Sequence, residues 1–343
     1  MKRILRISAL LLLLSVLLSA LASCGGGYRM KKSTEKEATP VFTIGEDTVN
    51  FELLYTFFLN RMEVAGLTLD TVGAEEFSDL MAAAEAEIAE IYALFAVCRE
   101  VGIDPFSKDV EKKITEYIKM NVDGGVVGDT WIEGSFEDYD AYLAYIREAY
   151  HMNDAVNRLL IRYAICEDLL VSHFKTAYPY TEADVRAFFG SDDCLHIVWV
   201  GRTATDGGLD REENLALMAS IRDYLIDGEI RSAIGLSLRQ DTDFYMGRYS
   251  KDDAYYGELI DTAYKLAVGE TSGIIDLGPS GFFVVKRLEK DTDDLDTRYR
   301  EIEEVFLTDA LYTDVEEKAA ELLQGIVYKD AYNALTVGDF REP

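Results

Sequence analysis

The run Cys194-Leu195-His196-Ile197-Val198-Trp199-Val200 constrains this chain most, because every residue in it except His196 is apolar. An Asp192-Asp193 pair precedes the run and Gly201 follows it. A short apolar run between turn residues predicts a strand that is buried on both faces. His196 lies two positions from Cys194 and therefore on the same side of that strand. The central question raised by the sequence is whether this histidine is catalytic or structural.

The start of the chain predicts an export signal with a lipid attachment site. A basic start (Lys2, Arg3, Arg6) precedes an apolar run over 7–22, which ends in Leu-Ala-Ser-Cys24 followed by three glycines. Small residues before a cysteine match the bacterial lipobox, in which the cysteine is lipidated and becomes the mature N-terminus. A membrane span is less favoured, because the run is shorter than the ~20 residues that cross a bilayer. We therefore expect a lipoprotein signal peptide over 1–23, lipidation of Cys24, and a location on the extracytoplasmic face of the cell membrane. An ordinary secretory signal is the alternative.

The composition predicts a globular and strongly acidic protein. With 343 residues, of which 49% are hydrophobic, the chain is long enough for two or three cores. Removal of the leader takes away three basic residues and no acidic one, so the formal charge changes from −29 to −32. Such a surface disfavours nucleic acid and anionic lipid and suits cationic or neutral partners such as unfolded polypeptides.

No cofactor or metal site is expected. Besides Cys24, the cysteines are Cys98, Cys166 and Cys194, which are widely spaced in apolar settings. This spacing is neither a disulfide framework nor a metal site and predicts small buried hydrophobes, although it leaves open whether Cys98 and Cys166 pair. The acidic stretch over 291–296 resembles the start of a calcium loop. It lacks the glycine and glutamate of an EF-hand, so we expect a solvated linker.

The N-terminal half predicts a helical domain over 41–180. Glycines and charged residues before it predict a flexible tether over 24–40. A hairpin over 41–49 opens the domain. Apolar residues at intervals of three or four then predict helices over 51–64, 74–101, 107–121, 135–150 and 153–176, with a glycine-rich loop over 123–129. Aromatic stripes in these helices are interpreted as core.

The rest of the chain predicts a small α+β domain over 181–290 and a returning segment over 291–343. Thr181 is the expected N-cap of a helix that leads into the opening strand. Further helices are predicted over 210–226, 230–238 and 255–265, and strands over 272–276 and 282–288. A helix over 297–323 and a strand over 325–328 follow. We expect them to pack on the N-terminal domain, because they need partners for their apolar faces.

Several stretches of the second domain resemble known motifs. Leu195-His196-Ile197-Val198 resembles the first strand of a parvulin-type peptidyl-prolyl isomerase domain. Ala-Tyr-Lys-Leu-Ala-Val-Gly-Glu-Thr-Ser over 263–272 and Gly-Phe-Phe-Val-Val-Lys-Arg over 281–287 resemble two further parvulin motifs, and 228–237 follows another loosely. With the N-terminal hairpin and helix, these stretches resemble the PrsA/SurA family of exported foldases. The resemblance implies an α+β chain in which N- and C-terminal segments build a SurA-like helical chaperone domain around an inserted parvulin-like domain.

The same resemblance implies a degenerate site. Parvulin sites hold two facing histidines with an acidic or cysteine residue between them. His196 matches the first histidine, whereas Phe283 stands at the position of the second and is expected to be non-catalytic. The acidic position falls near Arg239, with Asp241 and Asp243 close by. By the same resemblance, the residues that bind the proline are Tyr255, Leu259, Met246 and Phe244.

Prolyl isomerisation needs no nucleophile, but it needs an apolar socket and a polar network that favours the twisted amide, whose barrier is ~18–20 kcal/mol. Because the second histidine is missing, the sequence favours a hydrogen-bonded core histidine at 196. We expect a membrane-anchored extracytoplasmic chaperone or foldase for unfolded or nascent exported polypeptides, with isomerase activity weak or lost. The client groove would be lined by aromatics of the helical domain and by Tyr255 and Tyr256. An active peptidyl-prolyl isomerase is the alternative. A solute-binding lipoprotein is the least favoured, because such proteins need two lobes with parallel strands.

Overall fold

The computed structural model describes residues 28–127, 130–203, 208–237, 239–249, 257–278 and 281–341. The described chain divides into two units, which we call the sheet unit (173–312) and the helical unit (28–172 together with 313–341). Their boundaries fall inside two long helices, α6 (Asp154–Ala177) and α12 (Tyr299–Gln324). The predicted signal peptide over 1–23, the lipidation site Cys24 and the predicted pocket residue Tyr255 lie outside the described residues.

The helical unit begins with a three-stranded antiparallel sheet. Its strands are β1 (Pro40–Ile44), β2 (Asp47–Asn50) and β9 (Val327–Tyr328), in the order β2-β1-β9. Gly45, in the turn between β1 and β2, has a φ of +56°, which glycine adopts without steric cost. Phe42 pairs with Tyr328, so the last strand of the chain completes the sheet that the first strand starts.

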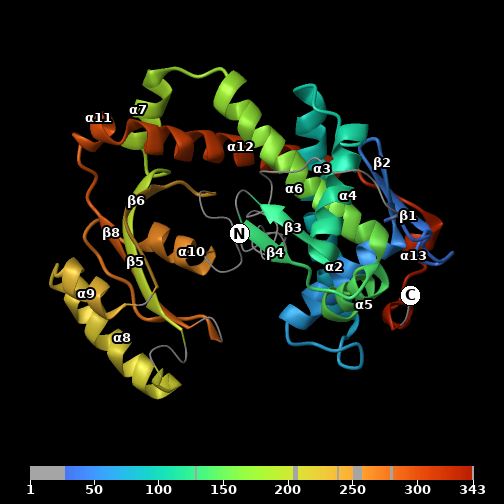
Figure 1. Ribbon diagram of the computed structural model, residues 1–343, viewed down its shortest axis with the longest axis horizontal. Helices are drawn as coiled ribbons and strands as arrows, with labels where there is room; N and C mark the ends of the chain where they lie inside the picture. Colours follow the sequence, from blue (N-terminus) through green and yellow to red (C-terminus); the bar gives the residue numbers. More distant parts are fainter. Residues whose placement is uncertain are drawn as a thin grey trace. The chain divides into compact units, whose positions relative to one another are not determined.

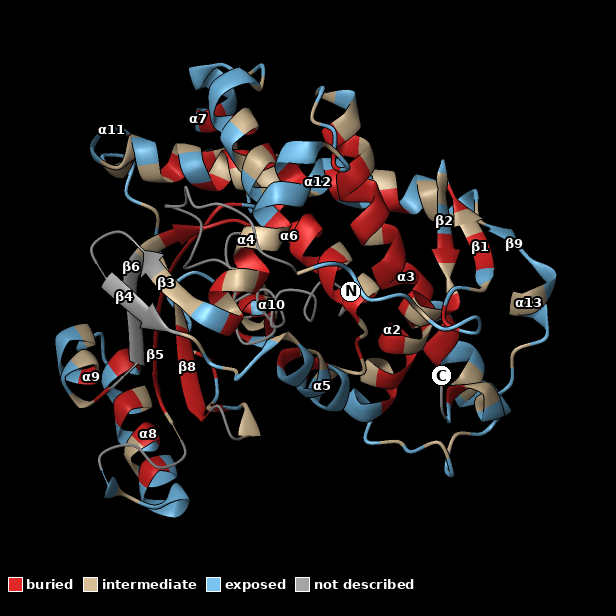
Figure 2. Ribbon diagram, turned by 45° about the vertical axis from the view of Figure 1, so that its right-hand side comes forward, coloured by how far each residue is buried: buried red, intermediate tan, exposed pale blue. Residues whose placement is uncertain are grey.

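Five helices follow the hairpin, and most begin and end within a few residues of the predicted bounds. They are α2 (Phe51–Val64), α3 (Ala74–Glu100), α4 (Lys108–Asp123), α5 (Tyr139–Tyr150) and α6. Ser107 caps α4, because its Oγ accepts the backbone N–H of Val110 at 3.3 Å. Figure 2 shows that α3 is buried along most of its length, as expected for the central helix of this core.

The last residues of the chain complete the core of the helical unit. After β9 come α13 (Asp330–Asn333) and a 3₁₀ turn (Val337–Phe340). Phe340 is fully buried, with its ring centroid 4.0 Å from that of Phe58 and 5.4 Å from that of Phe51. The C-terminal turn therefore fills a space between helices that lie almost three hundred residues earlier in the sequence.

The structure differs from the expectations for the helical unit in two places. The segment 123–129, expected to be a loop, contributes to a hairpin of β3 (Gly124–Val127) and β4 (Thr130–Glu133). Valines before a Gly-Asp pair and Thr-Trp-Ile after it favour two paired strands, because β-branched and aromatic residues suit a sheet. The segment 28–39, expected to be a flexible tether, is packed against α2, α5 and α6 by hydrogen bonds described below.

The sheet unit contains a four-stranded antiparallel sheet in the order β6-β5-β8-β7. The strands are β5 (Leu195–Arg202), β6 (Arg239–Met246), β7 (Ile275–Asp276) and β8 (Phe282–Leu288). Helices α8 and α9 lie on one side of the sheet and α10 on the other (Figure 1). The helices are α7 (Glu182–Gly190), α8 (Arg211–Ile226), α9 (Ile230–Leu236), α10 (Gly257–Lys265) and α11 (Asp294–Thr297).

Strand β6 is absent from the sequence-based expectation. Its first five residues, Arg-Gln-Asp-Thr-Asp, are polar and carry no alternation that predicts a strand. Pairing with β5 determines its conformation. The register shifts between Ile197 and Trp199, where β6 contains one residue more than β5. β6 is therefore a strand imposed by its neighbour rather than by its own composition.

The predicted α+β class is confirmed. Helices make up most of the described chain, and every strand pairing within it is antiparallel. Among the described residues, no helix is both long enough and apolar enough to cross a membrane.

Candidate functional site

The predicted site lies around β5, whose alternate side chains reach two different faces of the sheet. On the face covered by α10, Leu195, Ile197 and Trp199 belong to one buried cluster. On the face covered by α8 and α9, Val198 and Val200 belong to another. β5 is buried along its whole length, as its apolar sequence predicts.

The structure does not bring His196 and Phe283 together. His196 pairs with Leu288 on β8, whereas Phe283 pairs with Gly201, five residues further along β5. Paired residues of antiparallel strands project to the same face, and positions an odd number apart project to opposite faces. His196 therefore lies on the face opposite to Phe283, which packs on Trp199 with ring centroids 5.4 Å apart. A histidine at 283 would not face His196.

His196 has the surroundings of a structural histidine. Its side chain is 8% exposed, and its Nδ1 donates to the carbonyl oxygen of Glu289 at 2.8 Å. The imidazole stacks on the ring of Tyr245 with centroids 4.6 Å apart. The Tyr245 hydroxyl in turn donates to Asp294 at 2.6 Å, and burial and this carboxylate raise its pKa. The histidine thereby connects β5 to β6 and to the chain that follows β8.

Three of the predicted proline-binding residues do meet in one place. Leu259 on α10 and Met246 and Phe244 on β6 join the buried cluster that contains Phe283. Leu259 is 2% exposed and Met246 is 1% exposed, so these side chains form a packed core rather than an open socket. Tyr255 lies outside the described residues, as do the side chains of Arg239, Asp241 and Asp243.

This arrangement offers an apolar core without a histidine pair beside it. The polar network that the resemblance implies would require His196 to reach the α10 face, and the strand register places it on the other one. The described residues of this face thus provide hydrophobic packing for α10.

Asp309 on α12 is the carboxylate of the sheet unit whose pKa is raised most above its ordinary value. It accepts the backbone N–H of Tyr249 at 3.3 Å. Burial raises its pKa to about 6, with Asp193 nearby adding to the shift and Arg248 opposing it. Nothing in the sequence singles it out, because it is one of many acidic residues on a long amphipathic helix. It holds the end of β6 to α12.

The helical unit presents a surface of aromatic rings on and just before α5. The centroid of Phe136 lies 5.2 Å from that of Tyr145, which lies 5.9 Å from that of Tyr150. Tyr145 is 46% exposed, whereas Tyr142 on the same helix is 7% exposed and belongs to the core. We call Phe136, Tyr145 and Tyr150 the α5 aromatic surface. The sequence predicts core positions for aromatics at this spacing, but only one face of α5 is buried.

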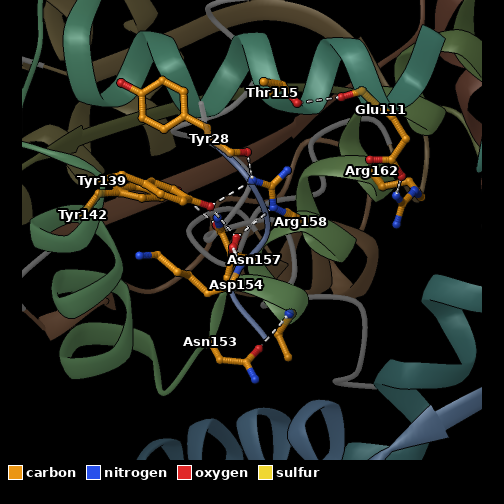
Figure 3. A network of polar contacts seen from close by, with 12 residues as sticks. Tyr28, Glu111, Thr115, Tyr139, Tyr142, Asn153, Asp154, Asn157, Arg158 and Arg162 are labelled. Atoms are coloured by element: carbon orange, nitrogen blue, oxygen red, sulfur yellow. Dashed lines mark hydrogen bonds and ion pairs between the residues drawn. The ribbon is translucent and has the colours of Figure 1, made fainter. Parts of the chain in front are cut away.

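A polar network lies at the base of α6, where Arg158 and Asp154 form an almost completely buried ion pair (Figure 3). The Nε of Arg158 donates to Asp154 at 2.9 Å, and the hydroxyl of Tyr139 donates to the same carboxylate at 2.6 Å. The Tyr139 hydroxyl also accepts a bond from Arg158 at 3.0 Å, and two further partners come from the segment that precedes β1. Arg158 donates to the carbonyl oxygen of Tyr28 at 2.7 Å, and the N–H of Lys31 donates to Asp154 at 2.6 Å.

Two cavities adjoin this segment in the helical unit. The larger, about 300 Å³, is lined by 31–34, Leu143, Met152 and Asp154 among others. The smaller, about 110 Å³, is lined by Glu37, Glu52, Tyr55 and His151 among others. Glu37 and Arg147 form an ion pair that borders both. Charges of both signs line these spaces, which does not single out one class of small ligand.

Among the described residues, no group of histidines, cysteines and acids is arranged to hold a metal ion. Cys98, Cys166 and Cys194 are buried free thiols. Cys98 on α3 lies close to α6, with its Sγ 3.8 Å from the carbonyl oxygen of Cys166. Burial raises the pKa of Cys194 to about 12, so this thiol is inert.

These features define an α+β protein in which a helical unit built from both ends of the chain contains an inserted unit with an antiparallel sheet. No protein-family model matches the chain, and no curated protein matches it.

Solved structures that the chain is similar to are PrsA proteins, which belong to the family that its motifs resemble. The foldase protein PrsA from Streptococcus pneumoniae is 13% identical over 88% of this chain and 97% of its own, with a TM-score of 0.31. The PrsA of Lactococcus lactis is 17% identical over 88% of this chain and 99% of its own, with a TM-score of 0.27. The PrsA of Bacillus subtilis is 15% identical over 84% and 93%, with a TM-score of 0.25. The low TM-scores mean that the molecules do not superpose closely.

Proposed function

We propose that this protein is a membrane-anchored extracytoplasmic chaperone that holds unfolded exported polypeptides and has little or no isomerase activity. The observation that carries the proposal is the α5 aromatic surface. Partly exposed tyrosine and phenylalanine rings bind apolar segments at little entropic cost, because each has only two side-chain torsions to order. A holding chaperone needs such a surface, open to many sequences.

The charge of the protein fits such clients. A formal charge of −29 for the full chain keeps the protein soluble while its aromatic rings remain exposed. It repels nucleic acid and favours neutral or basic segments of unfolded chains. Glu148 on α5 and Glu137 just before it are exposed beside the aromatic rings, so apolar contact and attraction to basic residues act in the same place.

The anchoring part of the proposal rests on the sequence before the described residues. The lipobox Leu-Ala-Ser-Cys24 predicts a lipid on Cys24 and thus a place on the outer face of the membrane. A chaperone at this position would meet exported chains as they emerge unfolded.

The alternative of an active isomerase is less well supported. His196 and Phe283 lie on opposite faces of the sheet, and the candidate proline pocket is a packed core. A solute-binding lipoprotein is disfavoured as well, because the strand pairings of the described chain are antiparallel.

Suppression of aggregation tests the holding function. The mature chain without its signal peptide, added at an equimolar ratio to an unfolded secreted protein, should reduce light scattering. Tyr145→Ser should raise the concentration needed for this effect several-fold. Tyr224→Ser is the matched control, because Tyr224 is 37% exposed on α8 in the other unit. If the two variants act alike, the α5 aromatic surface is not the binding site.

Isomerisation of a proline-containing peptide tests the enzymatic alternative. We expect the mature chain to accelerate it weakly or not at all, and His196→Ala to leave that rate unchanged. Strong catalysis that disappears in a folded His196→Ala variant would replace our proposal with the active isomerase.

A further inference from the structure

The segment 28–37, which we call the strap, is fixed to the helical unit by several contacts. The hydroxyl of Tyr28 donates to Asp123 at 2.5 Å, and the ring of Tyr28 packs edge-on against Tyr139 with centroids 5.1 Å apart. Further along, Ser33 donates to Glu52 on α2 at 2.5 Å, and Arg147 on α5 donates to Glu37. The strap thus has partners at both ends.

The strap also satisfies a buried ion pair, which explains why it stays in place. Arg158 and Asp154 are 6% and 4% exposed, and the main chain of Tyr28 and Lys31 supplies a hydrogen bond to each of them. Release of the strap would leave both charges with a missing partner inside the protein. The two charges stay paired with each other, so release of the strap costs two hydrogen bonds to buried charged groups, which are stronger than bonds between neutral groups.

The strap shortens the connection to the predicted lipid. After cleavage at Cys24, only Gly25, Gly26 and Gly27 separate that residue from Tyr28. Four peptide steps span at most ~14 Å. We propose that the face of the helical unit around Tyr28, Asp123 and the start of α5 lies against the outer surface of the lipid bilayer. This inference rests on the proposed lipidation of Cys24.

The short link between Cys24 and Tyr28 is what brings this face to the bilayer. The charge of the face does not attract anionic lipid. Asp123, Asp138 and Asp140 lie there, so the lipid on Cys24 has to supply the affinity.

The proposed orientation also places the client surface. α5 has 12 residues and is therefore about 18 Å long, with Tyr139 near the strap and Tyr150 at its far end. The α5 aromatic surface would then begin within one helix length of the bilayer. Exported chains emerging from the membrane would meet it before they can aggregate.

Lipid proximity of two labels on the helical unit tests the inference. Glu137→Cys places a label beside the start of α5, and Lys108→Cys places one at the opposite end of α4, about 22 Å along that helix from Asp123. Both positions are exposed, whereas Cys98, Cys166 and Cys194 are buried. Each full-length lipidated variant is reconstituted in phosphatidylcholine vesicles that carry a nitroxide on some head groups. We expect the fluorophore at 137 to be quenched several-fold more than that at 108.

A flexible insertion provides the control. About 15 Gly/Ser residues between Gly27 and Tyr28 add a mean reach of ~20 Å without changing the strap, and should remove most of the quenching at 137. Mass spectrometry of the N-terminal peptide reports the lipid independently. Absence of lipid on Cys24 overturns the anchoring and this inference together. Lipid on Cys24 with equal quenching at the two positions, or with no effect of the insertion, overturns this inference alone.

Discussion

The ring of Phe283 lies over Gly201 and occupies the space that a β-carbon on that glycine would fill. The two residues pair across β5 and β8, so the ring can pack on Trp199 only because position 201 has no side chain. The residue at the predicted second-histidine position is thus part of a fitted core contact.

Gly201→Ala should therefore destabilise the sheet unit. The added methyl group displaces Phe283 from a fully buried position, and overpacking of this kind costs about 1–3 kcal/mol. Urea unfolding followed by tryptophan fluorescence would report it, since Trp199 lies in the same cluster. Gly190→Ala is the control, because nothing lies within 4 Å of a β-carbon built there. Equal stabilities of the two variants would contradict the packing described here.

The buried ion pair of α6 makes a second prediction. Arg158→Met leaves the carboxylate of Asp154 buried without its charged partner and should destabilise the helical unit by about 3–5 kcal/mol. Lys31→Met removes a partner of Asp140 from a pair that is exposed on both sides, so it should have little effect on the free energy of unfolding. Thermal unfolding followed by circular dichroism measures both. A similar loss in the two variants would mean that the strap is not held through Arg158.

The C-terminal turn makes a third prediction. Phe340→Ala opens a cavity among the rings of Phe51, Phe58 and Phe77 and should cost about 3–5 kcal/mol. Arg341→Ala removes an exposed ion pair with Asp70 and should have little effect on the free energy of unfolding. Chemical denaturation of the mature chain compares them. An unchanged midpoint for Phe340→Ala would show that the turn does not contribute to the core.

Sequence patterns predict those parts of this fold whose burial is regular. The apolar runs of β5 and β8 and the stripe of α2 lie close to their predicted bounds, because most of their apolar side chains are buried. β6 and the strap are not predictable in this way. The start of β6 is polar and becomes a strand only by pairing with β5, and the strap is ordered by a buried arginine far along the chain. The separation of His196 and Phe283 likewise depends on the register between two strands, which neither sequence contains alone.

The pH dependence of stability provides the last prediction, through Asp309. Burial raises the pKa of its carboxyl from 3.8 to about 6, so the folded protein holds a proton that the unfolded chain releases above pH 4. The resulting stabilisation is fully present below about pH 4 and is lost as the pH rises through about 6. Asp309→Asn lacks this titration.

Carboxyls with a lowered pKa, such as Asp184, Asp276 and Asp339, change the stability in the opposite sense as the pH rises. They are present in both the wild type and the Asp309→Asn variant. Their contributions to the stability therefore cancel when the wild type and the variant are compared. Between pH 4 and pH 7 the free energy of unfolding of the wild type should fall relative to that of Asp309→Asn, by an amount on the order of 1–3 kcal/mol. Urea titrations at each pH measure this difference. A constant difference would show that Asp309 is ionised throughout this range.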